Sequence, residues 1–530
     1  MGKIQEIRES ETGKKIVKKG KSGIGRILFG RTGVIMLLLL LQLGILFMVF
    51  SRLQQHVIYV YWLFALLSAL TAILIINRPG NPAFKLAWMV PITIFPVFGM
   101  LLYLFVEFQA GERLLNRRLQ DVEQQMRKYV LQDPDVFEEL ERTDKRTSNL
   151  SRYVMEKGGF PTYKNYHTAY YPWGKDKFEV LIKELNKAEK FIFMEYFIVA
   201  EGKMWNTVLE ILKKKVQEGV EVRFMYDGTC SISLLPYNYP KKLEEYGIKC
   251  KIFNPIKPAL STVQNNRDHR KIVVIDGKTA FTGGVNLADE YIGELERFGT
   301  WKDTAIMIQG EAVRNFTLMF LEIWNVDEPQ ENYERYLDAS HCYGMMEGDG
   351  YVIPYGDSPL DHENVGELVY LDILNSAKDY VHIMTPYLIL DHEMITALTY
   401  AAKRGVDVKI IMPGIPDKAY AFALAKTYYP ELLRAGVKIY QYKPGFVHAK
   451  SFTSDDCKGV VGTINLDYRS LYLHFECAAF LYENSEIPAV ENDFQETLKK
   501  CQKITQEDYK KQKSFDKIAG SILRVFAPLM

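Results

Sequence analysis

Two segments of the chain carry histidine, lysine and aspartate at the same spacing. The segments 269–276 and 448–455 both read His-x-Lys-x-x-x-x-Asp, and each is followed by a glycine-led turn that ends in asparagine, Asn286 in the first copy and Asn465 in the second. The two histidines, like the two asparagines, are 179 positions apart. One match to so short a pattern carries a high risk of coincidence, whereas two matches in register lower that risk greatly. The sequence therefore predicts an internal duplication in which each copy supplies half of one site.

The segments that precede the two motifs have matching patterns of secondary structure. In the first copy we expect a strand at 191–197, a helix that ends at Gln217 and a strand at 220–226. Strands that alternate with amphipathic helices are typical of an α/β fold. The second copy repeats this order, with a strand at 380–387, a helix that ends at Arg404 and a strand at 406–414.

Histidine and lysine in this arrangement suit the exchange of a phosphodiester. The reaction needs a nucleophile, a proton donor for the leaving alkoxide, and donor groups or positive charge around the phosphate oxygens. Two copies brought face to face place two histidines on opposite sides of one phosphorus, with the lysines and asparagines as an oxyanion cradle. No cofactor or metal is expected, because these groups neutralise the phosphate and the sequence has no carboxylate cluster that would hold Mg²⁺.

The duplicated motif and its turn resemble the phospholipase D superfamily, and within it the chain is most similar to the bacterial cardiolipin synthases. The narrower resemblance rests on Asn-Leu-Asp-Tyr-Arg-Ser at 465–470 and on the run 77–103, which includes Asn-Arg-Pro-Gly and Pro-x-x-Gly. It implies an α/β fold of two phospholipase D-like α/β/α repeats packed face to face, preceded by N-terminal transmembrane helices. The implied catalytic residues are His269, Lys271, Asp276, His448, Lys450 and Asp455.

The resemblance also implies roles for these residues. One histidine forms a phosphohistidine intermediate while the other transfers protons. We assign His269 as the nucleophile and His448 as the acid and base, an order that the sequence does not settle. Asp276 and Asp455 each end the strand that begins at the histidine, so we expect them to fix the turn rather than to contact the phosphate.

Other residues are expected to support the phosphate and the histidines, namely Asn286, Asn465, Asp303 and Glu476. In the family a carboxylate on a strand after the turn holds the second nitrogen of the histidine, which Asp303 and Glu476 match. His474 departs from the pattern, because these synthases usually have asparagine there. Arg469 and Ser470 could bind lipid phosphate or cap a helix. Further candidates for the pocket lining are Glu195, Tyr196 and Tyr387, and the alternative for the two tyrosines is a place in the core.

Charge is unevenly distributed along the chain. The net charge is +1, but residues 1–31 hold nine Lys or Arg and three Glu, so the leader carries +6 and the remainder −5. This excludes a globally basic nucleic-acid-binding protein, and no nucleic-acid partner is expected. The six cysteines are scattered without a CxxC pair, as in reduced cytosolic proteins.

Two apolar runs, 33–50 and 57–76, have about the length that spans a bilayer. The positive-inside bias predicts a cytosolic N-terminus, so the two spans would form a hairpin. A third run, 86–108, contains two prolines and a glycine, which weaken a straight helix. If it re-enters the membrane or lies at the interface, the catalytic part stays in the cytoplasm, as the arginines after it favour; if it spans, that part lies outside. We expect a multi-pass protein of the bacterial plasma membrane with a cytoplasmic catalytic region.

These patterns predict six segments. The tail mixes lysines with apolar residues, which suits either a membrane surface or packing on the protein itself. The segments are a basic cytosolic leader (1–31), a membrane segment (32–108), a helical linker (109–160), a first phospholipase D-like repeat (161–335), a second repeat (336–505) and an amphipathic tail (506–530).

Cardiolipin synthesis is the function that the resemblance implies. One phosphatidylglycerol would give its phosphatidyl group to His269, glycerol would leave, and a second phosphatidylglycerol would attack. The alternatives are a phospholipase D-type hydrolase, a phosphatidyltransferase with another alcohol acceptor, and a membrane-tethered nuclease. A non-enzymatic scaffold is disfavoured, because neither motif has lost its histidine or lysine.

Overall fold

The computed structural model describes residues 57–107, 110–256, 265–328, 331–337, 347–361 and 363–529, with four single positions between 37 and 44. The chain divides into two compact units. The first ends at Arg113 and also takes in 256–264, and the second holds almost all the rest, including both histidine motifs.

The first unit contains three described helices, α4 (Val57–Asn77), α5 (Pro82–Ile94) and α6 (Pro96–Glu107). Asn81 caps α5 through its side chain, which accepts the N–H of Ala83 at 2.9 Å. The helical conformation is interrupted at Phe95, between α5 and α6 and within the third apolar run. A Cβ on Gly99 would lie 2.4 Å from the backbone of Pro91, so this close approach of α6 to the end of α5 requires glycine.

Membrane crossing was expected for two runs of the N-terminal segment. Among the described residues, no helix combines the length and the apolar character that a crossing needs. The second expected span, 57–76, coincides with α4, and the first, 33–50, lies outside the described residues apart from single positions, as does the basic leader.

Helices begin the second unit over the stretch expected to be a helical linker. They are α7 (Ala110–Met126), whose first residues belong to the first unit, α8 (Pro134–Thr143) and α9 (Lys145–Gly158). Asp133 and Asp144 cap α8 and α9 by accepting backbone N–H groups, and Gly159 ends α9 in the left-handed region at φ 75°. Leu119, Val122 and Met126 of α7 pack into the core of the enzyme unit.

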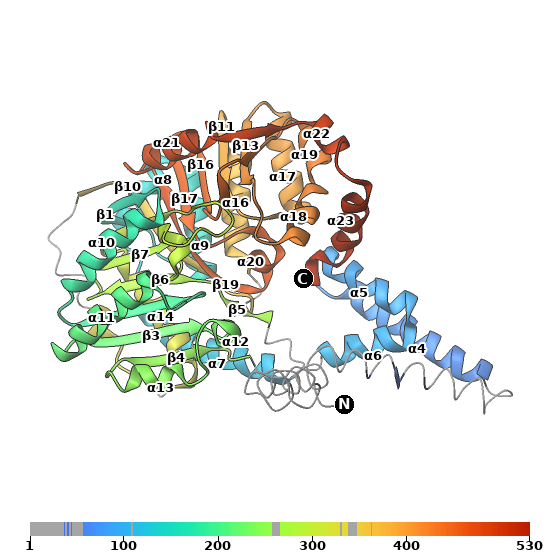
Figure 1. Ribbon diagram of the computed structural model, residues 1–530, viewed down its shortest axis with the longest axis horizontal. Coiled ribbons are helices and arrows are strands. Elements are labelled where there is room, and N and C mark those ends of the chain that lie inside the picture. The colour runs from blue at the N-terminus through green and yellow to red at the C-terminus, as the bar shows by residue number, and fades with distance from the viewer. Residues whose placement is uncertain are drawn as a thin grey trace, which may run out of the picture. The chain divides into compact units, whose positions relative to one another are not determined.

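One sheet of sixteen strands runs through the described part of the second unit. Each copy contributes a half-sheet of mixed direction, green in Figure 1 for the first copy and orange to red for the second. The first half-sheet has the order β9 (Ala305–Gly310), β7 (Thr279–Gly283), β6 (Lys271–Ile275), β2 (Phe191–Tyr196), β3 (Glu221–Asp227) and β4 (Lys249–Phe253). The second has the order β19 (His474–Tyr482), β17 (Lys458–Gly462), β16 (Ser451–Ser454), β11 (Tyr380–Met384), β13 (Asp407–Pro413), β14 (Lys438–Tyr442) and β20 (Cys501–Ile504).

The two half-sheets are joined at an edge that the sequence did not predict. β1 (Tyr163–Tyr171) pairs with β9 on one side and antiparallel with β10 (Glu347–Asp357) on the other, and β10 pairs with β19. Side chains of β6, β7 and β9 share one apolar core with those of β17 and β19. The two α/β repeats therefore pack against each other, as expected, and also form one continuous sheet.

Helices cover the strands, and the two expected to end at Gln217 and Arg404 end at Gln217 and Lys403. The covering helices are α10 (Gly174–Asn186) and α11 (Lys203–Gln217) in the first copy, α16 (Val365–Ser376) and α17 (His392–Lys403) in the second, and α14 (Val313–Trp324) after the first half-sheet. The polar faces of α10 and α11 are exposed while their apolar faces lie in the core. The mixed α/β fold with duplicated repeats is thus confirmed.

Candidate active site

The first histidine is held by a strand of the second copy. A short strand, β5 (Arg267–Asp268), pairs in parallel with the start of β19, and the N–H of His269 continues this pairing by donating to the carbonyl of Phe475 at 2.9 Å. The Nδ1 atom of His269 lies 2.9 and 3.0 Å from the two carboxylate oxygens of Glu476, which is fully buried. The carboxylate thus holds a proton on Nδ1 and leaves Nε2 free of it.

The second histidine is held by a strand of the first copy. Strand β15 (Gly445–Val447) pairs in parallel with β8 (Thr300–Lys302), and the N–H of His448 donates to the carbonyl of Lys302 at 2.7 Å. Its Nδ1 atom lies 2.6 Å from Oδ2 of Asp303, which is also fully buried. The arrangement is reciprocal, because each copy supplies the carboxylate that orients the histidine of the other.

Burial keeps both histidines uncharged at neutral pH. It lowers the pKa of His269 well below its usual value, and the ammonium groups of Lys271 and Lys450 lower it further. Burial and Lys450 lower the pKa of His448 to about 4, although Asp303 opposes them. Charges from both copies therefore act on each imidazole, and a neutral imidazole is the form that can attack phosphorus.

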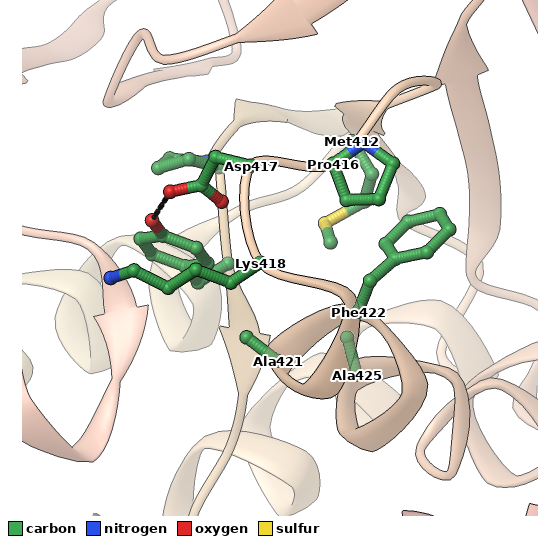
Figure 2. Close-up of a pocket in the computed structure, with 9 residues that line it drawn as sticks. Met412, Pro416, Asp417, Lys418, Ala421, Phe422 and Ala425 are labelled. Carbon is green, nitrogen blue, oxygen red and sulfur yellow. Dashed lines mark hydrogen bonds between the residues drawn. The ribbon is translucent and has the colours of Figure 1, made fainter. Parts of the chain in front are cut away.

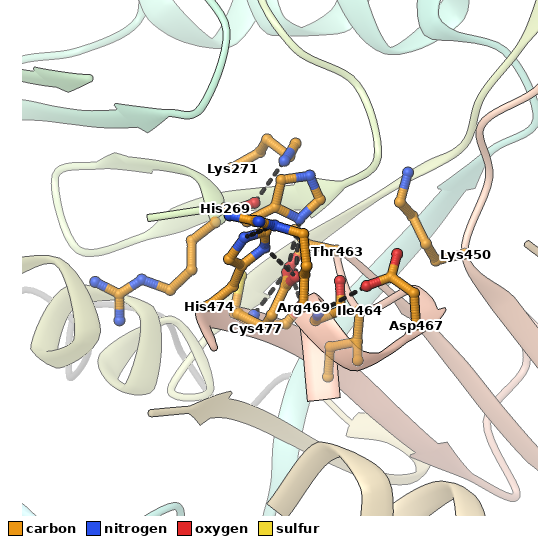
Figure 3. A network of polar contacts seen from close by, with 12 residues as sticks. His269, Lys271, Lys450, Thr463, Ile464, Asp467, Arg469, His474 and Cys477 are labelled. Carbon is orange, nitrogen blue, oxygen red and sulfur yellow. Dashed lines mark hydrogen bonds and ion pairs between the residues drawn. The ribbon is translucent and has the colours of Figure 1, made fainter. Parts of the chain in front are cut away.

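The two lysines contact the histidines of their own motifs. Figure 3 shows His269 and Lys271 of the first copy beside Lys450 of the second. Each ammonium donates to the backbone carbonyl of the histidine two residues before it, and Lys450 Nζ also lies 3.0 Å from Nδ1 of His448. Burial lowers the pKa of Lys271 to about 8 and that of Lys450 to about 7. A phosphodiester anion would favour their charged forms.

The two motif aspartates bind backbone rather than facing the histidines. The carboxylate of Asp276 accepts the N–H groups of 189–191 at 2.7 to 2.8 Å, and that of Asp455 accepts those of 378–380 at 2.7 to 2.9 Å. Both residues have a positive φ, 55° and 51°, in the turn after the strand. They hold the start of the neighbouring strands β2 and β11, which is a structural task.

The two turn asparagines have different surroundings. Asn286 accepts the N–H of Ile198 at 3.0 Å and donates to the hydroxyl of Tyr291 at 2.7 Å. The ring of Tyr291 packs edge-on against His448, with 5.6 Å between ring centroids. Asn465 is buried, and its Oδ1 atom has no hydrogen-bond partner among the described residues. Asn286 therefore positions an aromatic wall of the site, and the amide of Asn465 is the less constrained of the two.

His474, the departure from the family pattern, lies beside the nucleophile assigned from the sequence. Its ring centroid is 5.5 Å from that of His269, and its Nε2 atom accepts the Nε–H of Arg469 at 3.1 Å (Figure 3). Trp301 occupies the matching place in the first copy, where its ring lies 5.6 Å from that of His448. The two half-sites thus differ in the ring that packs on each histidine.

Two residues of the glycine-led turns were not singled out from the sequence. The Thr463 hydroxyl donates to the carboxylate of Glu476. At the matching position, a Cβ on Gly284 would lie 2.0 Å from Oδ1 of Asp303. Alignment of the two turns, Gly-Gly-Val-Asn and Gly-Thr-Ile-Asn, shows this difference and could have pointed to it.

Two candidates for the pocket lining prove to be core residues. Glu195 is fully buried and pairs with Arg270, whose Nε lies 2.6 Å from Oε1 of Glu195. The hydroxyl of Tyr196 accepts a hydrogen bond from the ammonium of Lys177 at 2.9 Å, and Tyr196 is also fully buried. The expectation that they line the pocket was wrong, because their charged partners come from distant segments that no local pattern predicts.

The remaining candidates of the second copy have clear partners. The Tyr387 hydroxyl donates to Asp417 at 2.6 Å at the edge of a small pocket. The N–H of Ser470 donates to Oδ1 of Asp467 at 2.9 Å, so that Asp467 caps the short helix α20 (Tyr468–Tyr472). Capping by Asp467 thus accounts for the turn that contains Ser470.

A metal ion does not fit the donor set beside His269. His269, His474 and Glu476 offer ligand atoms within 4.8 Å of one another. However, Nδ1 of His269 already bonds Glu476, and Nε2 of His474 accepts from Arg469. Two ammonium groups whose charge acts on His269 would repel a divalent cation.

Comparison with known proteins places these features in a family. Residues 181–324 and 370–498 match the family described as cardiolipin synthase, phospholipase D-like domain. The chain belongs to this family. Residues 60–107 match a second family, described as phospholipase D-nuclease N-terminal. Membership makes the chain an enzyme, a phosphatidyltransferase of the phospholipase D type.

Several relatives match this chain over most of its length. A protein of Streptococcus mutans, described as uncharacterized, is 53% identical over 86% of this chain and 98% of its own. A cardiolipin synthase of Alkalihalophilus pseudofirmus is 34% identical over 88% of this chain and 93% of its own. The crystal structure of a phosphatidylserine synthase from Haemophilus influenzae has the same fold, with a TM-score of 0.53 and 14% identity over 72% of this chain and 98% of that chain.

Proposed function

We propose that this phosphatidyltransferase is a cardiolipin synthase that moves the phosphatidyl group of one phosphatidylglycerol to a second and releases glycerol. The observation that carries the proposal is the reciprocal pair of buried histidines, each oriented by a carboxylate of the other copy. Cardiolipin synthases similar over most of the chain support the choice of lipid.

The proposed reaction has two displacement steps at one phosphorus. In the first, Nε2 of His269 forms a bond to phosphorus, the bond from phosphorus to the glycerol oxygen breaks, and His448 gives a proton to that oxygen. The phosphodiester anion raises the pKa of His448 when it binds, so that it can carry this proton. In the second, His448 takes the proton from a hydroxyl of the second phosphatidylglycerol, whose oxygen attacks phosphorus as the bond to His269 breaks.

The membrane is the proposed location of the enzyme. We propose attachment to the plasma membrane through the N-terminal segment, as a multi-pass protein with transmembrane helices, and a catalytic region on the cytoplasmic side. The match of 60–107 to an N-terminal family segment supports this, as do apolar side chains of α4 that are exposed in the described structure, among them Leu66, Leu70, Ile73 and Leu74.

The test is a defined incubation of the purified full chain. Mixed micelles that contain phosphatidylglycerol alone, without nucleotide, are followed for lipid and glycerol. Equal molar amounts of cardiolipin and glycerol are expected. Phosphatidic acid without cardiolipin would overturn the proposal in favour of hydrolysis, and cleavage of DNA in a parallel tube would point to a nuclease.

A further inference from the structure

Helix α23 (Ser514–Phe526), near the C-terminus, packs on the enzyme through the side that carries Gly520. It contacts α18 (Ala419–Lys426) through Gly520, where a Cβ would lie 2.7 Å from the carbonyl of Ala423. The guanidinium of Arg524 lies over the ring of Tyr428 at 4.4 Å. The side of α23 that faces the protein therefore includes Gly520 and Arg524.

The opposite side of α23 is apolar and exposed. At 100° per residue, positions 515, 518, 522, 525 and 526 lie within about one third of the helix circumference. A helix in water normally turns such a stripe inward, and a large exposed apolar patch marks a binding surface. The side chains of this outward face are 37 to 78% exposed, and they are Phe515, Ile518, Ile522, Val525 and Phe526.

The segment that contains α23 is strongly basic. Residues 510–526 contain five basic side chains and one acidic side chain, Asp516. An apolar face, with basic residues elsewhere on the same segment, is the pattern of helices that lie in the headgroup region of anionic bilayers. The basic side chains are Lys510, Lys511, Lys513, Lys517 and Arg524.

Helix α18 connects this surface with the region of the active site. Its Ala421, Phe422 and Ala425 line a small pocket together with Met412 (Figure 2). Lys418, which precedes α18, lies close enough to lower the pKa of His269, although burial and nearer charges dominate. A single helix thus separates the outward face of α23 from groups that act on the nucleophile.

We propose that the outward face of α23 docks into the surface of a bilayer that contains anionic phospholipid, and that α18 thereby fixes the distance of the active site from the lipid headgroups. The statement that this anionic lipid is also the substrate of the enzyme rests on the proposed function. The docking itself does not, and it is measured without turnover.

The first experiment places a nitroxide spin label on the full chain in bilayers. Ile522→Cys carries the label on the outward face, and Ser521→Cys carries it one residue away, outside the apolar stripe. The unsubstituted chain, labelled in parallel, gives the background of native cysteines. In vesicles of phosphatidylcholine and phosphatidylglycerol, the label at 522 is expected to collide more with oxygen than with a water-soluble nickel complex, and the label at 521 the reverse.

Two results would overturn the docking. Equal access of the nickel complex to both labels would show that the face stays in water. Shielding of the label at 522 from both oxygen and nickel would show that protein covers it, either this chain or a second copy. Vesicles of phosphatidylcholine alone are expected to weaken the contrast, because the basic side chains then lose their partners.

The second experiment separates docking from chemistry. The double variant Ile518→Glu/Ile522→Glu is expected to lose about tenfold in activity on vesicles, since neither glutamate can insert into the apolar part of the bilayer as isoleucine does. On short-chain phosphatidylglycerol dissolved as monomers, the double variant should be as active as the parent. The control Ser521→Glu should be as active as the parent on both vesicles and monomers. An equal loss on both substrates would contradict the docking role, whereas no cardiolipin from the parent would refute the proposed function alone.

Discussion

Replacement of Glu476 by glutamine tests the most specific feature of the site. The carboxylate is fully buried, receives Nδ1–H of His269 through two oxygens at 2.9 and 3.0 Å, and also binds the Thr463 hydroxyl. Glutamine has nearly the same shape, so the variant removes charge without opening a cavity. The fold is expected to survive while the histidine loses its charged partner.

The size of the effect follows from the strength of the hydrogen bond between His269 and the carboxylate. A hydrogen bond to a charged group contributes roughly 1.5–3 kcal/mol, and each 1.36 kcal/mol is about tenfold in rate, which gives a decrease of about 10- to 150-fold in kcat. If the amide nitrogen instead faces His269, the imidazole must carry its proton on Nε2 and cannot attack. A wrong tautomer of this kind costs about 10⁴-fold in a serine protease triad. We expect the observed decrease to fall between these limits.

The assay follows cardiolipin formation from phosphatidylglycerol in micelles, with folding checked by circular dichroism. Glu245→Gln, at an exposed position, is the matched control and should leave kcat unchanged. Asp303→Asn removes the corresponding carboxylate from His448 and should also slow the reaction. A folded Glu476→Gln variant with kcat near that of the parent would refute the reasoning.

Three further predictions concern the lysines, a motif aspartate and His474. Because the pKa of Lys450 is about 7 and that of Lys271 about 8, both lose their charge as pH rises, so kcat/KM for the anionic lipid should fall above pH 7 to 8; a flat profile to pH 9 would contradict this. Asp276→Asn should destabilise the fold by roughly 2 kcal/mol in thermal unfolding, because the carboxylate accepts three backbone N–H groups, yet keep activity when folded. His474→Asn keeps an acceptor for Arg469, so kcat should change less than about threefold, whereas His474→Leu should cost about tenfold.

The sequence predicted the repeated elements well because their signals are local. The helix expected to end at Gln217 does so, and the strand expected at 191–197 is β2 (Phe191–Tyr196). Apolar periodicity and the flanking glycines determine such elements without reference to the rest of the chain. The spacing of the motifs likewise indicated which residues would form each half-site.

Local sequence patterns could not predict the interactions between the two copies. The strand β5 has two residues, and its pairing with β19 joins positions about 200 residues apart. The ion pair between Glu195 and Arg270 is likewise a matter of tertiary packing, which is why Glu195 was misplaced at the pocket. The β1–β10 edge depends on the orientation of two repeats, and no periodicity encodes that orientation.

The exchange of carboxylates makes the two copies interdependent. Since Glu476 orients His269 and Asp303 orients His448, a change in either half affects the histidine of the other. A duplicated chain of this kind cannot divide its chemistry into two independent half-reactions. Neither copy alone contains a complete histidine and carboxylate pair.

Differences between the copies support distinct roles for the two histidines. Asp303 has room to approach His448 to 2.6 Å because Gly284 lacks a Cβ, and its charge counteracts the burial that lowers the pKa of His448. On the other side, Glu476 divides its oxygens between His269 and a threonine hydroxyl, and burial with the lysines lowers the pKa of His269 well below its usual value. A proton carrier must accept a proton during the reaction, whereas a nucleophile must stay neutral. The asymmetry is compatible with the order assigned from the sequence, with His448 as the acid and base and His269 as the residue that bonds to phosphorus.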